Sequence, residues 1–262
     1  MTDIFRLDNR TIVVIGAGSG IGQAVAVGAA RQGARVVCAD VRLDTAEATA
    51  GQIRGEGGMA DGVALDITDG AATDKVLGDV RAATKRLDGV ICTPSINVRK
   101  KLLDYAEEEF DRVVRVNLKG SFNVVRSAGR LMVEQQGGSI VIFSSIRSLV
   151  VEPGQAVYSM TKAGILQLVR GAACEFGGAG VRVNAVGPGV IETPLTAPIK
   201  AQPEWYRAYA DKNIFRRWAR AEEMVGPTLF LVSDAASYVT GTIIYADGGW
   251  LAQDGRFTPP GM

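Results

Sequence analysis

The amino-acid sequence predicts a single α/β domain built around a parallel sheet, and three observations support this prediction. Short β-branched segments alternate with amphipathic segments of helical length, which is typical of right-handed βαβ units. The first such segment, Thr11 to Ile15, leads directly into a glycine-rich turn and a helix. The 262 residues are enough for one sizeable core, and the chain shows no repeat, linker or low-complexity tract.

Seven segments have the composition of buried strands, and helical periodicity fills most of the chain between them. The predicted strands are residues 11–15, 35–39, 62–65, 89–92, 139–143, 182–186 and 243–246. One helix follows the glycine turn and ends near Gly33, and further helices are predicted over 44–56, 71–85, 107–136 and 156–176. Because ligands bind at the carboxyl ends of parallel strands, the candidate residues should converge at that edge of the sheet.

Composition restricts the function classes. The 29 basic and 28 acidic residues nearly cancel, so neither a nucleic acid nor a membrane is expected as partner. The N-terminus lacks a signal pattern and no apolar run could span a bilayer, so a cytoplasmic protein is expected. Three scattered cysteines indicate neither a disulfide framework nor a metal site. Since histidine is absent, proton chemistry must use tyrosine, lysine, carboxylates or water.

The glycine turn is a candidate pyrophosphate site. Gly16, Gly20 and Gly22 have the spacing G-x-x-x-G-x-G, which differs from the G-x-G-x-x-G fingerprint. A strand-to-helix turn without side chains lets backbone N–H groups approach an anion at the positive end of the helix. Asp40 follows the second strand at about the 20-residue distance expected of an acid that binds ribose hydroxyls. A tight turn without a ligand, and a polar strand end at Asp40, are the alternatives.

A second group of residues predicts acid/base chemistry at the same edge. Tyr158 and Lys162 are four residues apart and so share one helix face, and Ser145 follows the fifth strand. A lysine cation close to a phenol favours the phenolate and lowers its pKa. Such a group can take the proton of a secondary alcohol while hydride leaves for a nicotinamide.

Taken together, the motifs resemble the short-chain dehydrogenase/reductase family over about Leu7 to Leu251. They are Gly16-x-x-x-Gly20-x-Gly22, Asn117, Ser145, Tyr158-x-x-x-Lys162 and Pro188-Gly189. The resemblance implies a Rossmann-like, doubly wound, seven-stranded sheet with helices on both faces, a nicotinamide dinucleotide and a homotetramer. It also implies Tyr158 as general acid/base, Ser145 as the hydroxyl that polarises the substrate oxygen, and Lys162 as the group that lowers the tyrosine pKa and binds ribose. Asn117 would hold a water that relays protons from Lys162.

By the same resemblance, the cofactor contacts come from six segments of the chain. They are Gly16, Ser19, Gly20, Ile21 and Gly22 in the turn, Asp40 and Val41, Asp66 and Ile67 at the adenine, Thr93 and Pro94, Tyr158 and Lys162, and Pro188, Gly189, Ile191 and Thr193 near the carboxamide. Asp40 should repel the 2′-phosphate of NADP. Ser19 occupies a position where a basic residue would favour that phosphate, so NAD is predicted. The nearby Arg42 is an argument for NADP. Cys92-Thr93-Pro94-Ser95 replaces the family's Asn-Asn-Ala-Gly, and Pro94 removes a backbone donor there.

The substrate contacts are expected from Asn97, Ser145, Arg147, Gln155 and Tyr158. An inward-facing Arg147 would bind a carboxylate or several hydroxyls, and a solvated Arg147 is the equal alternative. Residues 192–217, rich in aromatics, are predicted to form a substrate lid, although these rings can equally serve the segment's own packing. The tail at 252–262 would reach a neighbouring subunit in a tetramer.

The sequence therefore predicts an NAD-dependent oxidoreductase that interconverts a secondary alcohol and a ketone on a small polar molecule, such as a hydroxy acid, a sugar or a polyol. A 3-oxoacyl-carrier-protein reductase is the alternative among enzymes, and Asp40 argues against its usual NADPH. The alternative of another class is a non-catalytic dinucleotide-binding sensor or scaffold.

Overall fold

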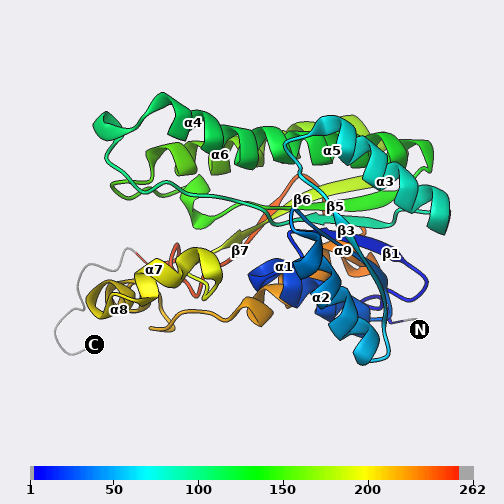
Figure 1. The fold of residues 1–262 in the computed structure, drawn as a ribbon, viewed down its shortest axis with the longest axis horizontal. Helices are drawn as coiled ribbons and strands as arrows, with labels where there is room; N and C mark the ends of the chain where they lie inside the picture. The colour runs from blue at the N-terminus through cyan, green and yellow to red at the C-terminus, as the bar shows by residue number, and fades with distance from the viewer. Residues whose placement is uncertain (1–2, 254–262) are drawn as a thin grey trace.

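The computed structural model describes residues 3–253, where seven strands form one parallel sheet (Figure 1). The strand order is β3-β2-β1-β4-β5-β6-β7. The strands are β1 (Thr11–Ile15), β2 (Arg35–Asp40), β3 (Met59–Ala64), β4 (Gly89–Cys92), β5 (Gly138–Phe143), β6 (Val181–Pro188) and β7 (Ile243–Ala246). The predicted Rossmann-like sheet is thus confirmed. The predicted tail at 252–262 lies almost entirely outside the described residues.

Helices cover both faces of the sheet, as expected of a doubly wound fold (Figure 1). One face carries α1 (Gly20–Arg31), α2 (Leu43–Gly55) and α9 (Val225–Val232), and the other carries α3 (Gly70–Thr84), α4 (Glu107–Val114), α5 (Gly120–Glu134) and α6 (Ala156–Phe176). Two short helices, α7 (Ala197–Lys200) and α8 (Pro203–Lys212), lie beyond the end of the sheet. None of the helices between residues 3 and 253 combines the length and apolar character needed to span a bilayer.

The alternation of side chains along β1 divides the apolar core into two layers. Ile12 and Val14 point into the layer under α1 and α9, whereas Val13 and Ile15 point into the layer under α5 and α6. All four side chains are buried, and full burial of such a side chain contributes roughly 1.5–3 kcal/mol. Strands that are buried on both faces therefore read as the continuous apolar runs seen in the sequence.

Two predicted elements differ from the structure. The third strand begins at Met59 instead of 62, because it pairs with β2 along its whole length at the sheet edge, where polar residues such as Asp61 are tolerated. The single helix predicted over 107–136 is two helices joined by a π-helical turn, Arg115–Lys119. Within this turn the carbonyl of Asn117 accepts a hydrogen bond from Ser121 Oγ at 2.7 Å. This bond accompanies the wider spacing of the backbone hydrogen bonds in the π-helical turn.

The strand order reverses at β1, which pairs with β2 on one side and with β4 on the other. In such sheets the crevice at the carboxyl ends of the strands is where ligands bind. The turns that follow β1, β2, β4, β5 and β6 all open toward this edge.

Candidate active site

The glycine turn after β1 is packed too closely for side chains. Gly16 has a φ of +83°, and a Cβ on Gly22 would lie 2.0 Å from the carbonyl oxygen of Gly16. The turn is held to the next strand because the backbone N–H groups of Gly16 and Ala17 both donate to the carbonyl of Ala39, at 2.8 and 3.0 Å. This geometry leaves the N-terminus of the 12-residue helix α1 facing the sheet edge.

Asp40 lies beside this turn. Its Oδ2 accepts a hydrogen bond from the Gly18 N–H at 3.0 Å, and its Oδ1 accepts one from the Arg42 N–H at 3.1 Å. The carboxylate is therefore fixed at the end of β2, next to the N-terminus of α1. Ser19, Val41 and Arg42 are exposed around it.

The predicted adenine contacts have different environments. Asp66 is exposed, and its carboxylate accepts a hydrogen bond from the Thr68 N–H at 2.8 Å. The Ile67 side chain is buried, and a Cβ on Gly120 would lie 2.6 Å from its Cδ1. Ile67 thus fixes the loop after β3 to the start of α5, and the predicted contact of this loop with adenine stays a prediction.

The loop after β4 closes onto the glycine turn. Thr93 donates from both its N–H and its hydroxyl to the carbonyl of Ile15, each at 3.0 Å. A Cβ on Gly16 would meet Pro94 at 3.1 Å, so the proline packs directly on the turn. The departure from the family's Asn-Asn-Ala-Gly therefore leaves the loop held by Thr93 and by proline packing.

The loop after β6 reaches the same turn from the other side. A Cβ on Gly20 would lie 3.4 Å from the Cβ of Thr193, and a Cβ on Gly189 would lie 2.7 Å from the Cα of Asp247. Pro188 ends β6, and Ile191 is buried and bridged to Ala219. The predicted cofactor residues thus come together along one edge, and the tight glycine packing fits the close approach of a dinucleotide backbone.

Tyr158, Ser145 and Lys162 meet where β5 ends against α6. Lys162 is only 1% exposed, and its Nζ donates to the carbonyl of Phe143 at 2.9 Å and lies 5.5 Å from the centre of the Tyr158 ring. Ser144 fixes the two elements together, since its Oγ donates to the carbonyl of Lys162 at 2.9 Å. The Ser145 Oγ accepts the Arg147 N–H at 3.1 Å, so its own hydrogen can be donated to another oxygen.

The acid/base properties of this group differ from the prediction. Burial raises the pKa of the Tyr158 phenol above its usual value, although hydrogen bonding to Ser145 and Ser95 and the charge of Arg147 oppose that rise. Burial also lowers the pKa of Lys162 to about 8. The prediction that the tyrosine pKa lies below its usual range is therefore wrong, because desolvation outweighs the neighbouring charges.

Asn117, in the π-helical turn, is fully buried and pairs with the backbone of Ile96. Its Oδ1 accepts the Ile96 N–H at 2.8 Å, and its Nδ2 donates to the Ile96 carbonyl at 2.9 Å and to Thr161 Oγ1 at 3.2 Å. The side chain thus ties the loop after β4 to α6, one residue before Lys162. The predicted water-holding role of Asn117 stays a prediction.

A cavity of about 300 Å³ opens beside Tyr158 and Ser145. The predicted substrate residues all line it, together with apolar and aromatic side chains from the 192–218 segment. The lining is Asn97, Arg99, Ser145, Ile146, Arg147, Gln155, Tyr158, Gly189, Val190, Leu195, Thr196, Pro198, Ile199, Trp205, Tyr209 and Trp218. Arg147 is 6% exposed, so the solvated alternative is wrong and the guanidinium lies in the cavity wall.

Arg99 in this wall was not predicted, Tyr209 was predicted only as part of the lid segment 192–217, and Glu152, which does not line the cavity, was not predicted either. Glu152 accepts hydrogen bonds from Arg99, Gln155 and Tyr209, and from Arg147 Nη2 at 2.5 Å. The sequence signal for Arg99 was its place two residues after Asn97, in the loop already predicted to contact substrate. No comparable signal pointed to Glu152.

The aromatic residues of the predicted lid pack largely against one another. The rings of Tyr206 and Trp218 stack with centroids 5.0 Å apart, and Trp218 Nε1 donates to the Tyr206 carbonyl at 2.9 Å. Tyr209 contacts Trp218 and Trp250 with centroids 5.7 and 5.8 Å away. The packing role considered from the sequence is thus confirmed; Tyr209 and Trp218 also line the cavity, and the role of the segment as a lid stays a prediction.

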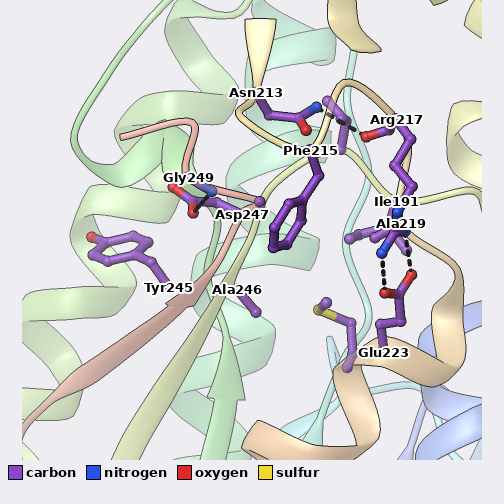
Figure 2. A pocket seen from close by; sticks show the side chains of 13 residues that line it. Ile191, Asn213, Phe215, Arg217, Ala219, Glu223, Tyr245, Ala246, Asp247 and Gly249 are labelled. Carbon is purple, nitrogen blue, oxygen red and sulfur yellow. Dashed lines mark hydrogen bonds and ion pairs between the residues drawn. The ribbon is translucent and has the colours of Figure 1, made fainter. Parts of the chain in front are cut away.

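A second cavity, of about 320 Å³, lies behind the loop after β6 (Figure 2). Figure 2 shows the double ion pair of Arg217 with Glu223, at 2.7 and 2.6 Å, beside the bridged Ile191 and Ala219. Of the predicted site residues that the structure describes, Ile191 alone lines it. Its walls therefore support the loop after β6, which is predicted to contact the cofactor, and contain none of the predicted catalytic side chains.

Comparison with known proteins agrees with this geometry. A family model described as Enoyl-(Acyl carrier protein) reductase matches residues 16–251. The chain is 37% identical to the 3-oxoacyl-[acyl-carrier-protein] reductase FabG of Thermotoga maritima, over 93% of this chain and 98% of that protein. A short-chain type dehydrogenase/reductase from Mycobacterium marinum superposes with a TM-score of 0.92 at 31% identity, covering 96% and 99% of the two chains. A gluconate 5-dehydrogenase from Burkholderia cenocepacia, in complex with NADP and tartrate, gives 0.93 at 29% identity, covering 96% and 98%.

The fold and the relatives define an oxidoreductase that uses a nicotinamide dinucleotide. The chain belongs to the short-chain dehydrogenase/reductase family.

Proposed function

We propose that this protein is an NAD-dependent oxidoreductase that interconverts a secondary alcohol and a ketone on a small polar substrate. The observation that carries the proposal is that Tyr158 and Ser145 line a cavity with polar groups in its wall, beside the buried Lys162 and at the sheet edge that also holds the glycine turn. Neither a sensor nor a scaffold requires a phenol, a hydroxyl and an ammonium to be assembled at a substrate-sized cavity.

The chain's own residues supply the proton chemistry. Ser145 donates a hydrogen bond to the substrate oxygen. The deprotonated Tyr158 oxygen takes the hydroxyl proton during oxidation, and the protonated phenol gives a proton to the ketone oxygen during reduction. Lys162 holds an exchangeable proton within the same buried group. When bound at the residues named above, the nicotinamide supplies the hydride acceptor or donor.

Asp40 supports the choice of NAD. Its fixed carboxylate lies beside the glycine turn, where it can accept hydrogen bonds from ribose hydroxyls and would repel a 2′-phosphate. The solved relative from Burkholderia cenocepacia is in complex with NADP, and a comparison of the two cofactors tests the choice for this chain.

The cavity wall supports a polar substrate with several oxygens. Asn97 and Gln155 are hydrogen bonded to each other at 3.1 Å, and Asn97 Oδ1 is buried without a partner among the described residues. Together with Arg99 and Arg147 they offer donors and an acceptor in a cavity that aromatic rings also line. A hydroxy acid, a sugar or a polyol fits this wall, and tartrate in the Burkholderia relative is a hydroxy acid.

An initial-rate screen tests the proposal. Purified protein is given NAD⁺ or NADP⁺ with hydroxy acids, sugars, polyols and cyclic alcohols, and NADH or NADPH with the matching ketones and with a 3-oxoacyl thioester. We expect the highest kcat/KM with NAD⁺ and a polyhydroxylated substrate, and loss of turnover with intact NADH binding in Tyr158→Phe. A strong NADPH preference with the 3-oxoacyl thioester would favour the carrier-protein reductase instead, and NADH binding without any turnover would favour the sensor.

The homotetramer and the cytoplasmic location stay predictions.

A further inference from the structure

We propose that Glu152 is the positioning residue that assembles the polar wall of the substrate cavity and fastens helix α8 to it. This inference deepens the proposed function, on which it rests, by assigning the order of the wall to one carboxylate. Glu152 itself is not among the described residues that line the cavity, so it acts through other side chains.

The carboxylate of Glu152 gathers four side chains from three separate segments. Arg99 comes from the loop after β4, Arg147 and Gln155 come from the segment between β5 and α6, and Tyr209 comes from α8. Arg99, Gln155 and Tyr209 donate to Oε1, and Arg147 donates to Oε2 at 2.5 Å. Each of the four also lines the cavity, so a single acceptor sets the orientation of the wall.

The charges explain why a carboxylate is needed at this position. Arg99 and Arg147 are two cations at one small cavity, and Glu152 faces both of them. A neutral side chain at position 152 would leave the two guanidinium groups to repel each other at low dielectric constant. Charge-assisted hydrogen bonds from both arginines also fix their planes more firmly than neutral bonds would.

The contact with Tyr209 extends the effect to the lid segment. Tyr209 is buried, and its ring lies in the aromatic cluster with Trp218 and Trp250, while its hydroxyl reaches Glu152. Trp205 on the same helix lies over the guanidinium of Arg99 at 4.8 Å. The side of α8 that faces the cavity is therefore held by the same ion-pair network that orders the polar wall.

Three variants test the positioning role. Glu152→Gln keeps the shape and removes the charge, Glu152→Asp keeps the charge, and Tyr209→Phe removes only the hydroxyl that contacts Glu152. Glu108→Gln is the matched control, because Glu108 is exposed on α4, does not line the cavity, and forms no ion pair with any residue between 3 and 253.

With the best polyhydroxylated substrate of the screen, we expect Glu152→Gln to raise KM at least about tenfold, equivalent to about 1.4 kcal/mol of lost binding, with a smaller change in kcat. The Kd for NADH should stay unchanged, and Glu152→Asp should recover part of the KM. In Glu152→Gln and Tyr209→Phe, limited proteolysis within 197–212 should become faster, whereas Glu108→Gln should match wild type in both measurements.

A KM within twofold of wild type in a folded Glu152→Gln, or unchanged proteolysis in both Glu152→Gln and Tyr209→Phe, would overturn the inference. If the wild-type protein turns over no substrate, the proposed function fails by itself. The proteolysis comparison then still decides whether Glu152 holds α8.

Discussion

The ammonium of Lys162 donates a hydrogen bond to the backbone carbonyl of Phe143 at 2.9 Å, although the side chain is almost completely buried. Burial of the charge lowers the pKa of Lys162 to about 8, so the group changes its charge within the range in which such enzymes are assayed. One neutral carbonyl therefore does not restore the solvation that the ammonium loses.

This relationship predicts the pH dependence of ketone reduction. Reduction needs a proton on Tyr158, whose pKa lies above its usual value, and we expect it to need a proton on Lys162 as well. Lys162 is protonated below about pH 8, so kcat/KM for reduction should be constant below that pH and fall as the pH rises through about 8. The measurement is a pH profile in both directions, in which oxidation should instead increase toward alkaline pH. Reduction that stays constant up to pH 10 would contradict this role of Lys162.

The choice between NAD and NADP depends on the charge of Asp40. Asp40→Asn keeps an acceptor for the Gly18 or Arg42 N–H but removes the charge that would repel a 2′-phosphate. We expect the ratio of kcat/KM with NADP⁺ to that with NAD⁺ to rise about tenfold, which corresponds to about 1.4 kcal/mol. Asp44→Asn, exposed in the first turn of α2, is the matched control and should leave the ratio unchanged. An unchanged ratio in Asp40→Asn would show that another residue sets the preference.

The fold and the meeting of Ser145, Tyr158 and Lys162 could be predicted from the sequence because their signals are local. The β-branched run of β1 identifies a strand buried on both faces, and the spacing of Tyr158 and Lys162 places both on one face of α6. The ends of β3 were less certain, because an edge strand tolerates polar residues such as Asp61.

The part of the candidate site that the sequence did not predict depends on contacts between distant segments. Glu152 meets Arg99 across 53 residues and Tyr209 across 57, and no single stretch of sequence records either contact. The raised pKa of Tyr158 was likewise missed, because the four-residue spacing to Lys162 gives no measure of desolvation. The local motif indicates which side chains lie together, whereas their burial in the folded structure determines their pKa values.

The buried amide of Asn117 predicts a combined loss of stability and activity. Asn117→Ala removes the acceptor for the Ile96 N–H and the donor to the Ile96 carbonyl, so both backbone groups lose their described partner. Leaving such groups unpaired costs about 1–3 kcal/mol, and we expect the free energy of unfolding in urea to fall by about that amount. The loop after β4 should loosen, so kcat should fall as well. A change of less than about 0.5 kcal/mol, the scatter typical of surface substitutions, would mean that the amide is not a structural tie.

The close approach of Gly22 to Gly16 predicts that the turn rejects even one methyl group. A Cβ on Gly22 would lie 2.0 Å from the Gly16 carbonyl oxygen, so Gly22→Ala must displace the backbone that faces the cofactor. We expect a loss of roughly 1–3 kcal/mol in stability, as in other overpacked sites, together with weaker NADH binding in a fluorescence titration. Gly226→Ala is the control, because a Cβ at that position would meet no atom of a packed neighbour within 4 Å among residues 3–253, and alanine favours helix α9 by up to about 1 kcal/mol. If Gly22→Ala bound NADH as tightly as Gly226→Ala, the turn could not be the close-contact surface for a dinucleotide.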